Sequence, residues 1–281
     1  PAGTTDGWKL VVRNTIDSSG VDHRHWTTST MWVAGHLART ELSDPRMAGA
    51  GPEFALPIAI VNDSAHTMTF IVDRTRSASV TQLPAAPQIG RWNDTTSRFI
   101  VAPAMTMHDL GAGEPILGHP THKYRITMSY VAQEPLMGLP CKRTVNSDET
   151  IWAATDLQRE QNLRQYVRDS RPLTNVELGP VMDSLQRLRL HRERLINGLI
   201  LRSATALTKP GSAVTVTTTL EVTELTHGPI PEAMFAVPAG YTTLPTPPRT
   251  ASPAAESAAR ARIAARDSII RTKVRAAVCE P

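Results

Sequence analysis

Two histidines near the N-terminus have a spacing that suits metal ligation. His23 and His25 lie two residues apart in the stretch Asp22-His23-Arg24-His25, so both side chains point to one side if this segment is a strand. No cysteine or carboxylate with a matching spacing follows them, and the neighbouring Ser18-Ser19-Gly20 predicts a polar hairpin turn that needs no metal. We therefore expect no metal site, with His23 and His25 as the candidates if one exists.

Other residue types that could do chemistry are scattered along the chain. His119 and His122 are three residues apart, which places them on opposite sides of a strand, so exposed polar positions account for them. The carboxylates Asp73, Glu149 and Asp156 could pair in space, but exposed strand ends are their commoner location. The sequence contains no Gly-x-Ser-x-Gly elbow, no phosphate-binding glycine loop and no dinucleotide fingerprint. We expect a non-catalytic protein without a cofactor.

The positive charge of the chain is concentrated at its C-terminal end. The formal net charge is +4, and residues 249–281 alone contain seven basic and three acidic side chains, so the rest of the chain is neutral. This segment has no aromatic residue to stack on bases and too small an apolar face for a membrane surface, so we expect no nucleic acid partner. A protein partner is the expectation, and a solvated Ala/Arg helix is the alternative. The residues expected to make the contact are Arg260, Arg262, Arg266, Arg271 and Arg275.

The N-terminus and the cysteine content predict an exported protein. The chain begins Pro1-Ala2-Gly3 without a methionine, as after removal of a signal peptide, although trimming for expression gives the same start. Cys141 and Cys279 allow one disulfide, which would fasten the C-terminal segment to the body, or they are two unrelated thiols. No apolar run reaches the roughly 20 residues of a membrane-spanning helix. We expect a periplasmic or extracellular protein that is peripheral to a membrane.

Alternating apolar residues predict a mainly β protein. Trp8, Leu10, Val12 and Ile16 alternate with more polar positions, which is the period of a strand with one buried face. The same pattern recurs often enough to predict about ten strands. The segments concerned lie near residues 8–16, 24–43, 54–62, 68–72, 76–83, 98–107, 124–130, 198–208 and 214–222.

Two further segments differ in composition from these strands. Between residues 156 and 197 Gln, Arg, Glu and Leu replace the β-branched residues, which predicts two helices, the second ending at Asn197-Gly198. The proline-rich stretch from Leu244 to Pro253 is typical of an extended linker. We therefore divide the chain into a body, residues 1–245, and a linker with a basic tail, residues 246–281.

Three segments of the body resemble a known family. They are Pro229 to Tyr241 with the strand before it, His119 to Thr127, and Thr150 to Leu157. The pattern is similar to an uncharacterised exported branch of proteins with the LolA/LolB-like lipoprotein-carrier fold. That resemblance implies a curled antiparallel sheet, or half-barrel, over residues 1–245 with a helical lid at about 156–197 and an apolar cavity able to hold lipid.

Two functions are compatible with this set of expectations. Because the basic tail has no counterpart in the family pattern, we expect an accessory subunit that docks onto a larger membrane-associated assembly, with the half-barrel as docking body and the tail as a strap. The alternative is a periplasmic carrier or binding protein for a hydrophobic ligand, such as a lipid or a lipoprotein acyl chain.

Overall fold

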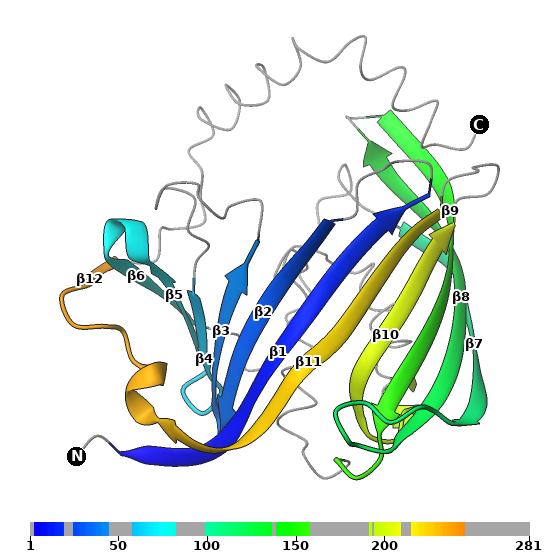
Figure 1. Cartoon of the computed structure of the whole chain (residues 1–281). Coiled ribbons are helices and arrows are strands. Elements are labelled where there is room, and N and C mark those ends of the chain that lie inside the picture. The colour runs from blue at the N-terminus through cyan, green and yellow to red at the C-terminus, as the bar shows by residue number, and fades with distance from the viewer. Residues whose placement is uncertain are drawn as a thin grey trace.

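The computed structural model describes residues 3–19, 25–44, 58–82, 99–136, 139–157, 191–192, 194–208 and 215–244. The described residues form a mainly β protein with one open, curled sheet (Figure 1). His23, most of the expected helical lid, Cys279 and the five tail arginines lie outside the described residues. Within the described residues no helix is both long and apolar enough to cross a membrane.

The sheet has twelve strands in the order β12-β6-β5-β4-β3-β2-β1-β11-β10-β9-β8-β7. All neighbouring strands run antiparallel except β12 and β6, which are parallel. The bounds of the strands are β1 Thr4–Ser18, β2 His25–Ala34, β3 Leu37–Ser43, β4 Ile58–Asn62, β5 Thr67–Val72, β6 Ser77–Gln82, β7 Phe99–Ala112, β8 Thr121–Leu136, β9 Leu139–Ala154, β10 Leu199–Thr208, β11 Thr215–Pro231 and β12 Thr242–Leu244.

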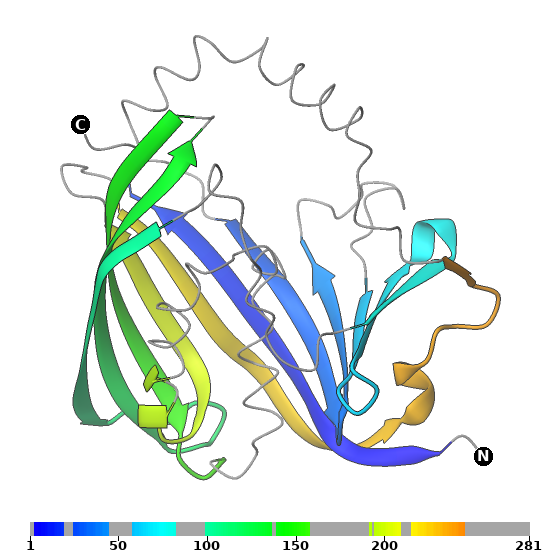
Figure 2. The same cartoon turned by 180° about the vertical axis from the view of Figure 1, so that it is seen from behind.

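The pairing of β1 with β11 joins two antiparallel meanders into this single sheet. Strands β1 to β6 follow one another on one side of the pair, and β10 back to β7 follow on the other. The pair runs from Thr4 opposite Pro231 to Ser18 opposite Val216, so it is formed by the two ends of the described body (Figure 2). The centre of the sheet therefore depends on contacts between residues that are distant in sequence.

One face of the sheet is buried along β1, β2 and β11. Leu10 pairs directly with Met31, and both side chains are almost fully buried, as is Val12 opposite Val222. The alternation in the sequence predicted this face at Leu10 and Val12, but Ile16 is 37% exposed because it lies near the end of β1.

The alternation in β5 identified the sides of the strand but not the buried one. Met68, Phe70 and Val72 share a face as the pattern predicts, and each is half-buried. Ile71 on the opposite face is fully buried, in a cluster with Ile60 and Ala78. Residues after β11 complete this cluster, because Phe235, Val237 and Tyr241 pack against it.

The chain re-enters the sheet before β10 through the end of a helical segment. Residues 191–192 and 194–195 are helical, and the helix ends before Asn197-Gly198, as predicted. Ile196 is buried against Tyr124, Ile126 and Ile151. Gly198 has a φ of 120°, and a Cβ atom there would lie 2.2 Å from the carbonyl oxygen of Ala154, so only glycine fits this turn.

Candidate functional site

A row of charged and aromatic side chains crosses five strands on one face of the sheet. Lys123, Trp152, Arg202, Glu221 and Arg13 occupy directly paired positions on β8, β9, β10, β11 and β1. Residues opposite each other in an antiparallel pair point to the same side. On β1 this is the side opposite Leu10 and Val12, so the row lies on the face that the core does not use.

Trp152 lies between two cations of this row. The Nζ atom of Lys123 is 4.8 Å and the Cζ atom of Arg202 is 5.4 Å from the centre of its ring. Arg202 also donates from Nε and Nη2 to Oε1 of Glu221, at 3.0 and 2.7 Å. These contacts hold the indole and both cations in fixed positions.

Two more tryptophans on this face each pair with an arginine. The Cζ atom of Arg13 is 5.7 Å from the ring centre of Trp26, and that of Arg39 is 6.0 Å from Trp32. The strand register places Trp26 and Trp32 on the same side as Arg13, and Trp26 is 41% exposed. We call this surface the cation–tryptophan face; it comprises Arg13, Trp26, Trp32, Arg39, Lys123, Trp152 and Arg202.

Glu114 ties the β7–β8 connection, residues 113–120, to the same face. Its carboxylate accepts a hydrogen bond from the Trp152 indole N–H and another from Nη1 of Arg202, both at 2.7 Å. The pKa of Glu114 is below its ordinary value because its own backbone N–H, then the Trp152 indole, donate to the carboxylate, with a smaller contribution from the charge of Arg202.

The β7–β8 connection ends in a tight two-residue turn. Ile116 and His119 exchange backbone hydrogen bonds of 3.1 and 2.9 Å, and the central residues Leu117 and Gly118 have φ values of 52° and 82°. Positive φ at both central residues is the geometry of a type I′ turn, which favours Asn-Gly or Gly-Gly. Thr121 fastens the base of the connection by donating from its hydroxyl to the carbonyl of Glu114 at 2.7 Å.

The two histidines of this region each contact a different aspartate. Nε2 of His122 lies 2.5 Å from Oδ1 of Asp109, and Nδ1 of His119 lies 2.9 Å from Oδ2 of Asp156. The backbone N–H of Gly111, then the ring of His122, lower the pKa of Asp109. The pairs join β8 to β7 and the connection to the residues after β9, so their placement accounts for them as fastenings.

The remaining predicted site residues are not brought together. Asp73 accepts a hydrogen bond from the hydroxyl of Tyr241 at 2.7 Å, and Glu149 accepts one from Arg192 at 2.7 Å. His25 begins β2, with Nε2 3.7 Å from Oδ2 of Asp44. Among the described residues no cluster of three or more His, Cys, Asp or Glu side chains could hold a metal ion.

Cys141 lies near the start of β9, as the sequence predicted. Its expected partner Cys279 and the arginines of the tail are outside the described part of the chain.

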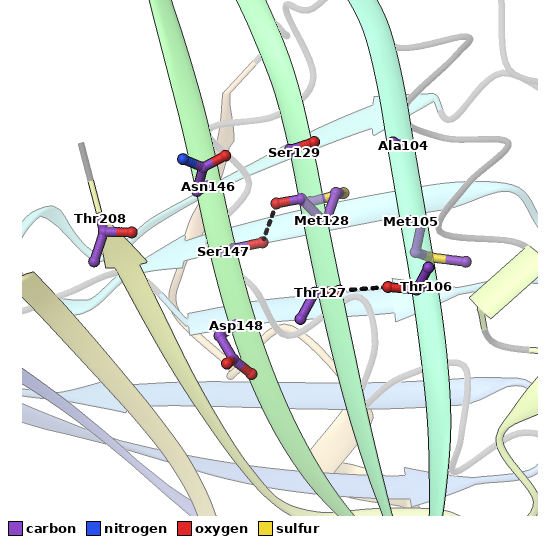
Figure 3. A pocket seen from close by; sticks show the side chains of 10 residues that line it. All are labelled: Ala104, Met105, Thr106, Thr127, Met128, Ser129, Asn146, Ser147, Asp148 and Thr208. Atoms are coloured by element: carbon purple, nitrogen blue, oxygen red, sulfur yellow. Dashed lines mark hydrogen bonds between the residues drawn. The ribbon is translucent and has the colours of Figure 1, made fainter. Parts of the chain in front are cut away.

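A shallow hollow of about 290 Å³ lies across β7 to β10 (Figure 3). Its floor is polar: the hydroxyls of Thr106 and Thr127 lie 2.5 Å apart, and Ser147 donates to the carbonyl of Met128 at 3.5 Å. Asp148 borders it and is held by Arg125, which lowers the pKa of that carboxyl. Ten residues line the hollow: Ala104, Met105, Thr106, Thr127, Met128, Ser129, Asn146, Ser147, Asp148 and Thr208.

No protein-family model and no curated protein matches the sequence. Among solved structures, one of PNGF-II is similar at 11% sequence identity with a TM-score of 0.36, over 86% of this chain and 32% of that one. The chain thus spans about a third of the length of PNGF-II. These values are too low to assign a fold family or an activity to this chain.

Proposed function

We propose that this chain is a non-catalytic, exported accessory subunit that docks onto a larger membrane-associated assembly. The observation that carries the proposal is the cation–tryptophan face. Tryptophan and arginine are the residue types most enriched at the energetic centres of protein interfaces, and here they recur together along one broad sheet face. An extended surface of this kind suits a protein partner better than a small molecule, which prefers a concave pocket.

We infer further that the curled sheet is a half-barrel of the LolA/LolB-like kind and that residues 156–197 form its lid. Two contacts of the described residues support this. The guanidinium of Arg192 donates to Glu149, and the backbone N–H of Asn197 donates to the hydroxyl of Tyr124 at 3.3 Å. Both bonds attach the end of the 156–197 segment to β8 and β9.

The basic tail is proposed to act as a strap along the same assembly. β12 ends at Leu244 and is the outermost strand beside β6, so the segment that carries Arg260, Arg262, Arg266, Arg271 and Arg275 follows directly from an edge of the sheet. Guanidinium groups make bidentate bonds to carboxylates, which suits an acidic protein surface. A disulfide between Cys141 and Cys279 would fasten the strap; the mass after alkylation with and without reductant tests it, and alkylation of both thiols without reductant rules it out.

The test of docking is recovery of the full-length chain from native membranes and identification of the proteins that co-purify in stoichiometric amounts. Trp26→Ala should weaken binding to the purified partner at least about tenfold, because truncation of an interface tryptophan removes a major contact. Leu42→Ala is the matched control, since Leu42 is equally exposed, at 41%, but is not part of the face. A wild-type chain that is recovered without any stoichiometric partner would contradict the proposal.

A carrier of a hydrophobic ligand is the second candidate, favoured by the apolar face of the curled sheet. Leu10, Met31, Val33 and Leu201 lie in one buried cluster on that sheet. If the chain is a carrier, it should purify alone with lipid that organic extraction and mass spectrometry detect. Lipid-free protein bound to a membrane assembly would decide against this candidate.

A further inference from the structure

We propose that Leu117, at the tip of the β7–β8 connection, is the apolar anchor that inserts into a pocket of the protein partner. The inference rests on the proposed docking function and assigns one contact within it. Leu117 is 45% exposed, so packing within the described chain does not account for a leucine here. The turn does not account for it either, because its φ of 52° is a conformation that disfavours bulky side chains.

The contrast with other left-handed residues makes Leu117 unusual. Among the described residues other than glycine, His66 and Arg76 also have positive φ values, of 50° and 44°. Histidine is enriched in this conformation, and Arg76 follows a short helix, where its N–H donates to the carbonyl of Asp73 at 3.1 Å. Leu117 instead places an exposed apolar side chain where Asn or Gly is the better local choice. A contact outside the chain supplies the missing reason.

The base of the tip is firmly held, so the side chain is presented in a fixed position. Ile116, the residue before it, is only 6% exposed and packs in the main core cluster. His119, the last residue of the turn, is tied to Asp156. A contact residue that is already ordered loses little conformational freedom on binding, which favours affinity.

The chemistry of the tip points to a protein rather than a lipid surface. Leu117 is a single apolar side chain between Pro115 and Pro120, whereas stable attachment to a membrane needs a much larger apolar area. Through Glu114, which bonds to Trp152, the connection adjoins the cation–tryptophan face. We therefore assign the partner an apolar pocket of leucine size beside the surface that covers this face.

The experiment compares full-length wild type, Leu117→Asn and the control Leu42→Asn for thermal stability and for binding to the purified partner. Asparagine suits the left-handed turn, so Leu117→Asn should keep or raise the melting temperature. Burial of the exposed part of a leucine corresponds to about a threefold to tenfold change in Kd, so the same variant should bind that much more weakly. Leu42→Asn should bind as the wild type does.

Each alternative outcome has its own meaning. If the wild type binds a stoichiometric partner and Leu117→Asn binds equally well, the anchor is wrong and the docking function stands. If the wild type has no partner, both proposals fail. A lower melting temperature for Leu117→Asn shows a structural role and overturns the assignment. Loss of binding to vesicles of phosphatidylethanolamine and phosphatidylglycerol by Leu117→Asn would show that the anchor contacts lipid, and would overturn it as well.

Discussion

Four glycines separate two reasons for requiring glycine, backbone conformation and lack of space. Gly198 combines a φ of 120° with a Cβ position 2.2 Å from the carbonyl oxygen of Ala154. Gly118 has a φ of 82° and nothing within 4 Å, whereas Gly7 has its Cβ position 2.4 Å from the carbonyl oxygen of Val33 and no unusual φ. Gly228 has neither restriction.

The expected stability changes on substitution by alanine follow from these differences. Gly118→Ala should cost about 1 kcal/mol for the left-handed conformation alone. Gly7→Ala should cost about 1–3 kcal/mol, because a strand backbone must move to admit the methyl group. Gly198→Ala carries both costs and should lose about 3–5 kcal/mol. Gly228→Ala should be neutral or slightly stabilising, since alanine restricts the unfolded chain.

Urea denaturation of the four full-length variants, followed by tryptophan fluorescence, measures the series. The order of midpoints should be Gly228→Ala, Gly118→Ala, Gly7→Ala and then Gly198→Ala, from highest to lowest. If Gly198→Ala is no less stable than Gly118→Ala, the close approach between the turn and the carbonyl of Ala154 does not exist in solution. The description of how β10 joins β9 would then be incorrect.

Three further predictions concern charge. The pKa of Glu114 is lowered in the folded state, so its contact stabilises the fold above the unfolded value of about 4.3 and is lost as the pH falls through the lower folded value; Trp152 emission should change below about pH 4.3, and the change should be absent in Glu114→Gln. Glu149→Leu should destabilise the protein by about 3 kcal/mol in urea denaturation, because the nearly buried Arg192 loses its carboxylate; an unchanged midpoint would refute this. Deletion of residues 249–281 should preserve the urea midpoint but release the chain from its partner at lower salt, whereas retention at the same salt would refute the strap.

The strands that could be predicted from the sequence are those with one apolar face. β1 shows the alternation clearly at Leu10 and Val12, and β8 shows it at Tyr124 and Ile126, both of which are buried. β9 was not predicted as a strand over its full length, because its central stretch of polar and charged residues hides the alternation. The ion pairs that accommodate this stretch come from β8 and from the segment before β10, as Arg125 bonds to Asp148 and Arg192 to Glu149.

The candidate site could not be predicted for a related reason. Lys123, Trp152 and Arg202 come from three strands, and only the register of β8, β9 and β10 places them side by side. A cation beside a tryptophan leaves no local pattern in the sequence when the two residues are far apart along the chain. Leu117 gave no signal either, because the sequence alone does not show that its backbone adopts a positive φ.

The seam between β1 and β11 also sets the order in which this protein can fold. Thr4 cannot meet Pro231 until nearly the whole described body has been synthesised, whereas β1 to β6 can pair as successive hairpins much earlier. Closing so long a loop is slow, and until it closes β1 is a free edge able to pair with another chain. Refolding should therefore be slow and sensitive to protein concentration, with the seam as the step at which folding and aggregation compete.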